Sequence, residues 1–109
     1  PEAFATDWEA LSAAQHAVVQ GYDYQFLPVQ RWFIYLPFEH SENLTHQRQC
    51  VKLFQQLSHD RDSAKAIEQS LIHLEIIERF GRFPHRNSIL GRNSTASEKK
   101  FLQQPSSWF

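Results

Sequence analysis

Four arginines lie close together near the end of the chain, in a segment of unusual charge. From Arg79 to Ser97 the sequence contains no aspartate, glutamate or lysine. The basic side chains of this segment are Arg79, Arg82, His85, Arg86 and Arg92. Arginine suits a carboxylate or phosphate because its planar guanidinium donates two parallel hydrogen bonds. The segment is therefore the first candidate for a site that holds an anion.

The position of these side chains relative to helix ends sharpens this expectation. Gly81 predicts the end of one helix, and Pro84 predicts the start of a short helical turn over 84–90. Arg79 then falls in a last turn, where a cation is favourable, but His85 and Arg86 fall in a first turn, where it is not. A cation is tolerated at a helix start when an anion shares the site.

That anion has three candidate sources. The protein could supply it from Glu39, Glu42 or Asp60, or from a segment before Pro1, which makes the cluster an internal ion-pair network. A ligand could supply it instead, namely a small anion or an acidic peptide. Nucleic acid is disfavoured because four arginines form a small patch and the whole chain has a formal net charge of −1.

A second polar cluster, Glu39-His40-Ser41-Glu42, precedes an expected helix that contains His46. A histidine beside carboxylates suits acid–base chemistry or metal binding. The sequence has neither His-x-x-x-His nor His-Glu-x-x-His, and Cys50 is its one cysteine. We therefore predict no metal or other cofactor, an inert core thiol at Cys50, and a hydrogen-bonded role for His40 at a helix start. His16, His59 and His73 are expected to be solvated.

The elements that position these residues are expected to be helices. Apolar spacing and capping residues predict helices over 7–20, 28–36, 42–58, 64–80 and 96–104. Ser41 is the expected N-cap of the third, Pro37 and Pro105 are expected to stop the second and last, and Thr95-Ala96-Ser97-Glu98 reads as a capping box. With no alternating strand pattern, the fold class is all-α, with five to six helices in antiparallel hairpins and one domain over 1–109.

Two features concern the surroundings of this domain. No apolar run is long enough for a membrane span and no signal segment is present, so a cytoplasmic protein without membrane contact is expected. The chain contains no methionine and opens on Pro1, which predicts that a longer protein continues before it. We also expect an uncovered apolar face, to be covered by that missing N-terminal segment or by a second copy in a homodimer.

Several motifs together resemble one known family. They are Phe4-Ala5-Thr6-Asp7, the run from Tyr35 to Glu42 (Tyr-Leu-Pro-Phe-Glu-His-Ser-Glu), the run from Phe80 to Asn87 (Phe-Gly-Arg-Phe-Pro-His-Arg-Asn), Leu90-Gly91-Arg92 and Ser94-Thr95. Nearly all of these residues, in this order, are similar to the bacterial family called domain of unknown function 924. The resemblance implies an all-helical, tetratricopeptide-like fold, and it supplies no activity.

The resemblance also implies that the chain is the C-terminal part of a family member. Members have further N-terminal helices, one with an Asp-Gln-Phe-Pro-Arg-Asn run that this sequence lacks. The site candidates carried over by motif position are His40, Glu42, Arg82, His85, Arg86, Asn87 and Arg92. We expect a helical scaffold whose Arg/His/Asn pocket binds a small anionic ligand or acidic group. The alternative is a hydrolase of phosphorylated or carboxylated small molecules, with His40 or His85 as the acid–base; whether the protein is an enzyme is left open.

Overall fold

Residues 7–104 are described by the computed structural model of the chain. They form five α-helices and three short 3₁₀ turns, and this range contains no strand. In chain order these are α1 (Asp7–Val19), η2 (Tyr22–Gln25), α2 (Pro28–Glu39), α3 (Leu44–Gln55), η3 (Arg61–Ser63), α4 (Ala64–Phe80), η4 (Pro84–Arg86) and α5 (Ala96–Leu102). The predicted all-α class with five helices is thus confirmed, whereas the tetratricopeptide-like arrangement stays a prediction.

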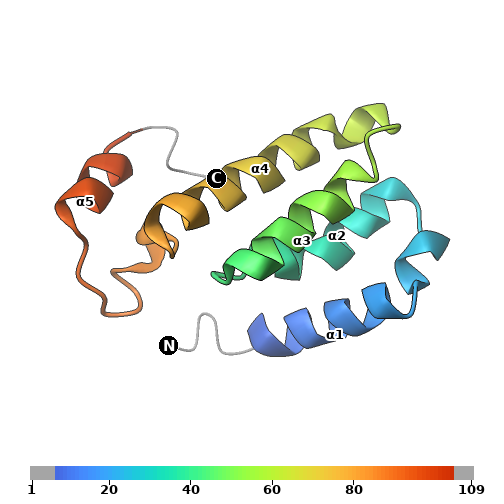
Figure 1. The fold of residues 1–109 in the computed structure, drawn as a ribbon, viewed down its shortest axis with the longest axis horizontal. Helices are drawn as coiled ribbons and strands as arrows, with labels where there is room; N and C mark the ends of the chain where they lie inside the picture. Colours follow the sequence, from blue (N-terminus) through green and yellow to red (C-terminus); the bar gives the residue numbers. More distant parts are fainter. Residues whose placement is uncertain (1–6, 105–109) are drawn as a thin grey trace.

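The first four helices pack as successive antiparallel neighbours. Helix α1 lies against α2, α2 against α3, and α3 against α4, as Figure 1 shows. Their shared core is built from one face of each helix, and its buried side chains are Ala14, Tyr35, Phe38, Cys50, Leu53, Phe54 and Leu57. The shortest dimension of the molecule is 20 Å. This is about two helix diameters, so a helix in this arrangement keeps at least one face open.

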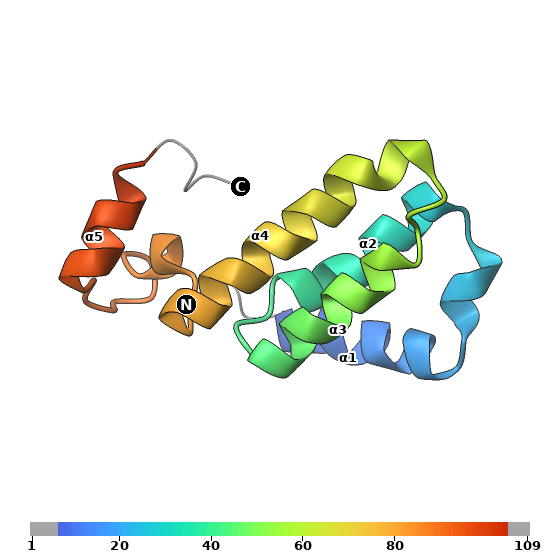
Figure 2. The same cartoon turned by 45° about the horizontal axis from the view of Figure 1, so that its top comes forward.

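A smaller core joins the end of α4 to the last helix. It contains Ile76, Ile77, Phe83 and Phe101, and α5 lies beyond the end of α4, away from α1 to α3 (Figure 2). The segment between α4 and α5 carries most of the arginines singled out above. Phe83 anchors this segment in the smaller core.

The expected stop at Pro37 is wrong, because α2 continues to Glu39. A proline inside a helix removes the hydrogen bond that its own N–H would have donated. The following turn is restored by the N–H of His40, which donates to the Leu36 carbonyl at 3.0 Å. The extra turn carries Glu39 into the core and places His40 at the C-terminal end of the helix. The expected stop at Pro105 lies outside the described residues.

The expected N-cap of α3 is also wrong. The cap is Asn43, whose side-chain oxygen accepts hydrogen bonds from the N–H groups of Thr45 and His46. The Ser41 hydroxyl is instead 2.7 Å from Nδ1 of His46. Because the helix starts later than expected, Glu42 precedes it and its carboxylate can reach another part of the chain.

Other local expectations hold. Gly81 ends α4 in the left-handed conformation, with φ of 71°, and Thr95 and Glu98 form the predicted capping box. Cys50 is fully buried, as expected for a core thiol. His73 corrects the expectation of a solvated ring: it is 7% exposed and its Nδ1 lies 2.7 Å from the Gln69 carbonyl. His73 falls on the face of α4 that packs inward. The helical spacing of the sequence alone did not show that His73 belongs to this face.

Candidate functional site

Arg92 is held by Glu42. Its guanidinium donates to the two carboxylate oxygens at 2.9 and 3.2 Å, and the N–H of Phe83 donates to the same carboxylate at 2.6 Å. Burial alone would raise the pKa of Glu42, but these hydrogen bonds and the charge of Arg92 hold it below its ordinary value. Glu42 is therefore ionised at neutral pH and ties the start of α3 to the segment after α4.

Arg82 is held by a different carboxylate, that of Glu98. Its Nε and one terminal nitrogen donate to the two oxygens at 2.8 and 2.6 Å, a bidentate pair. The hydrogen bond from Arg82 is the largest influence that lowers the pKa of Glu98, to about 2. Glu98 also accepts from the N–H of Thr95, so one carboxylate both caps α5 and fixes Arg82.

Asn87 is hydrogen-bonded to both ion pairs, to Arg92 of one and to Glu98 of the other. It is 1% exposed, its amide oxygen accepts from Nε of Arg92 at 3.0 Å, and its amide nitrogen donates to the Ser94 hydroxyl at 3.1 Å. A buried amide with partners at both ends fixes the conformation of the 87–94 turn. Asn87 thus orders the segment and does not present its polar atoms to solvent.

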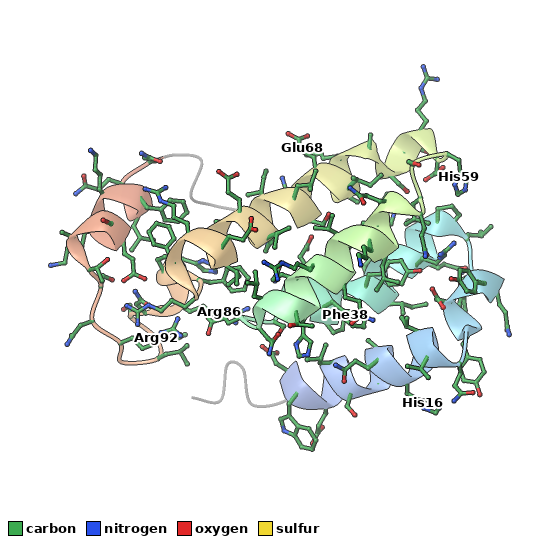
Figure 3. All side chains as sticks on the ribbon, in the orientation of Figure 1. His16, Phe38, His59, Glu68, Arg86 and Arg92 are labelled. Carbon is green, nitrogen blue, oxygen red and sulfur yellow. The ribbon has the colours of Figure 1, made fainter. Side chains whose placement is uncertain are left out.

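Arg86 lies at another position, beside the end of α2. One terminal nitrogen donates to the His40 carbonyl at 2.8 Å, and the guanidinium lies over the Phe83 ring, 4.7 Å from its centre. Figure 3 shows Arg86 near the place where α4 ends and α3 begins, with Arg92 farther toward α5. These contacts set the direction of the Arg86 side chain.

A surface hollow of about 310 Å³ opens beside Arg86. Its wall brings together the first turns of α1, the end of α2 and the segment after η4. The lining residues are Asp7, Trp8, Leu11, Pro37, His40, Ser41, Glu42, Arg86 and Leu90. This volume is at the lower end of the range of small-ligand pockets. It combines an apolar wall with a few polar groups, the composition that such pockets commonly have.

Charge in the hollow is set by four groups. Desolvation lowers the pKa of His40, and the positive charge of Arg86 lowers it further, so the imidazole is neutral at pH 7. Desolvation also lowers the pKa of Arg86, while the negative charges of Glu42 and Asp7 oppose that shift. Among the described residues that line the hollow, Asp7 at the start of α1 is thus a second acid whose charge acts on Arg86.

The seven residues carried over by motif position separate into groups. His40, Glu42 and Arg86 line the hollow, whereas Arg82, Asn87 and Arg92 form the internal network, which meets the hollow at Glu42. His85 is an exposed residue whose ring lies 5.9 Å from that of Phe83, and it is not among the lining residues. The structure gathers these residues, and a role for them in ligand binding stays a prediction.

One carboxylate partner of the arginines was predicted correctly from the sequence, and another was not. Glu42 was among the expected partners of the arginines, and it pairs with Arg92. Glu39 and Asp60 do not pair with that segment: Glu39 faces His73 and Asp60 accepts from the Ser63 hydroxyl. Glu98 was not expected, although its place in a capping box directs its carboxylate back toward the preceding loop.

The hollow also contains residues that sequence reasoning did not assign to a site. From the sequence, Asp7 and Trp8 were interpreted as the start of the first helix, and Ser41 as the N-cap of the third; all three line the hollow. No sequence signal joined α1 to the arginine segment, because their approach depends on the packing of α1 on α2 and on the contact of Arg86 with the end of α2. Among the described residues, no group of three or more metal-ligating side chains lies close enough together to hold a metal ion.

Within residues 7–104, none of the helices combines the length and apolar character that crossing a bilayer requires. The expectation of a cytoplasmic location stays a prediction.

Comparison with known proteins gives a consistent result. Residues 1–106 match the model of a family described as "Bacterial protein of unknown function (DUF924)". The structure is similar to that of a protein of unknown function, ATU0120 from Agrobacterium tumefaciens, with a TM-score of 0.83 and 38% sequence identity. That similarity covers 91% of this chain and 53% of the Agrobacterium chain, so this chain spans about half the length of that protein. No curated protein matches the sequence.

Proposed function

We propose that this chain, which belongs to the DUF924 family of bacterial proteins of unknown function, binds a small anionic group in the hollow beside Arg86. The observation that carries the proposal is the position of Arg86, which lines a hollow large enough for a small ligand together with His40 and Ser41. Arg82 and Arg92 hold carboxylates of the chain itself and order the segment that carries Arg86.

The neighbouring groups fit an anion of modest size. Arg86 offers a charged donor, and the Ser41 hydroxyl and the neutral His40 ring offer uncharged polar contacts nearby. Trp8 and Leu11 supply an apolar wall, which favours a phosphate or carboxylate attached to a small organic body over a bare ion. An acidic side chain of a peptide presents the same chemistry.

A thermal-shift screen tests this proposal. Orthophosphate, nucleoside monophosphates, dicarboxylates and acidic peptides are each added to the wild-type chain and to Arg86→Ala. A ligand at 100 times its Kd adds about 2.7 kcal/mol of stability, a clear shift for a domain of this size. The matched control is Arg61→Ala, which removes an exposed arginine from η3, away from the hollow. A shift that is lost in Arg86→Ala and kept in Arg61→Ala supports the site.

Hydrolysis of a phosphorylated or carboxylated small molecule is the second candidate function. The observation in its favour is that His40 lines the hollow and has a lowered pKa, so at neutral pH it is in the form that a general base requires. Turnover of a phosphoester panel that is abolished by His40→Ala would favour the enzyme. Binding without turnover would leave the chain a binding domain.

A further inference from the structure

The outer face of α2 is apolar and exposed. Val29, Phe33, Leu36 and Pro37 follow helical spacing, and Phe33 and Val29 are 68% and 46% exposed. The opposite face of the same helix buries Tyr35 and Phe38 in the core, so α2 has apolar residues on two sides. A helix that is apolar on both sides is typical of one that is covered on both sides.

A shallow groove extends this face toward α1. It is lined by Asp7, Ala10, Phe33, Leu36, Pro37 and His40. The exposed Trp8 lies next to Asp7 on α1 and lines the adjoining hollow, which shares Asp7, Pro37 and His40 with the groove. Large exposed aromatic side chains beside a groove with a small residue such as Ala10 fit the packing of another helix.

The comparison with the Agrobacterium protein indicates what covers this face. The matched part superimposes with a TM-score of 0.83, yet just under half of that chain has no counterpart here. A helix of the unmatched part that packs on the matched part needs an apolar surface there. On this chain the outer face of α2 is an apolar surface with helical spacing, bordered by a groove.

We infer that the outer face of α2, together with the groove beside α1, is the docking surface for a helix from the part of a DUF924 chain that these 109 residues do not contain. The docked helix packs on Val29 and Phe33 and lies against the edge of the hollow at Pro37 and His40. It thereby supplies a further wall to that hollow. Docking depends on the apolar face and does not require that an anion be bound.

Overlapping peptides that cover the unmatched half of the Agrobacterium protein provide the test. Each peptide, fluorescently labelled, is titrated with the wild-type 109-residue chain, with Phe33→Glu and with Leu71→Glu. Leu71 is a matched control because it is a large apolar residue of α4 that is 44% exposed and absent from the groove. We expect at least one peptide to bind, with affinity about tenfold or more weaker for Phe33→Glu and unchanged for Leu71→Glu.

Three results would overturn the inference. In the first, no peptide binds. In the second, a peptide binds and Phe33→Glu does not weaken its binding. In the third, the chain alone sediments as a dimer and its Phe33→Glu variant sediments as a monomer. The last would assign the face to a second copy. Circular dichroism of each variant confirms that the fold is kept. Because Phe33 does not line the hollow, the uncharged variant Phe33→Gln should bind orthophosphate as the wild type does, which separates this inference from the anion site.

Discussion

Arg92 and Glu42, which are 50 residues apart in the sequence, form a two-point ion pair with distances of 2.9 and 3.2 Å. The same carboxylate accepts the N–H of Phe83, so one side chain preceding α3 fixes two points of the segment that follows α4. This pair sets the position of η4 and therefore of Arg86. The proposed anion site thus depends on an ion pair whose carboxylate residue, Glu42, also lines the hollow.

The pair should contribute measurably to stability. We expect Arg92→Ala to lower the free energy of unfolding by about 2 kcal/mol, because it leaves the partly buried Glu42 carboxylate without its cationic partner. Chemical denaturation measures the change. Arg61→Ala, at an exposed position, should change stability little; an equal loss for both variants would contradict the structural role of Arg92.

Glu98 predicts a loss of stability in acid. The hydrogen bond from Arg82 lowers the pKa of Glu98 from its ordinary value of 4.5 to about 2. A carboxyl group whose pKa is lower in the folded state stabilises the fold above pH 4.5, and this contribution disappears as the pH falls toward 2. The Tm of the wild type should therefore fall through this interval more steeply than that of Glu98→Gln. Parallel curves for the two proteins would contradict the Arg82–Glu98 pairing.

Glu39 predicts the opposite dependence. Burial raises its pKa from 4.5 to about 7, so the folded state favours the protonated form. Its contribution is fully present below pH 4.5 and is lost as the pH rises through 7. Between pH 4.5 and 8, the free energy of unfolding of the wild type should fall by about 2 kcal/mol or more relative to that of Glu39→Gln. Denaturation at the two pH values measures this, and the exposed Glu68→Gln should show no such difference. If Glu39→Gln and the wild type respond equally to pH, Glu39 does not titrate as described.

Burial also lowers the pKa of His73 to about 4. Although Nδ1 of His73 lies 3.9 Å from Oε1 of Glu39, the ring is therefore neutral at pH 7 and the two do not form an ion pair there.

Whether a feature of the fold could be predicted from the sequence depends on how far apart along the chain its interacting residues lie. Gly81 and the Thr95–Glu98 capping box were predicted correctly because a left-handed C-terminal residue and a cap act within one turn. The N-cap of α3 was assigned to Ser41 rather than Asn43, since both are good caps two residues apart and only the packing of the helix selects between them.

For contacts between residues far apart in the sequence, the sequence reduced the number of candidate partners but did not identify the partner. Three carboxylates were candidates for the arginines, and only the packing of α3 beside the end of α4 brings Glu42 to Arg92. Likewise, the approach of α1 to the arginine segment, which places Asp7 in the hollow, follows from the tertiary arrangement and leaves no local pattern.

Asp7 gives a prediction of increased affinity. It lines the hollow, and its negative charge acts on both Arg86 and His40. Asp7→Asn should therefore tighten the binding of an anion about threefold or more at low salt, with a smaller gain at high salt. Titration at two salt concentrations measures the effect. Glu9→Gln is the matched control, because Glu9 is in the same first turn and does not line the hollow. Weaker binding by Asp7→Asn would contradict an anion site at this position.

The central claim is that Arg86 receives an anion, and calorimetric titration with a nucleoside monophosphate, a phosphate on a small organic body, tests it most directly. The account predicts saturable binding of one nucleoside monophosphate by the wild type, the same binding by Arg61→Gln, and loss of binding by Arg86→Gln, with all three proteins equally folded by circular dichroism. Binding by Arg86→Gln equal to that of the wild type, or no binding by the wild type, would contradict it.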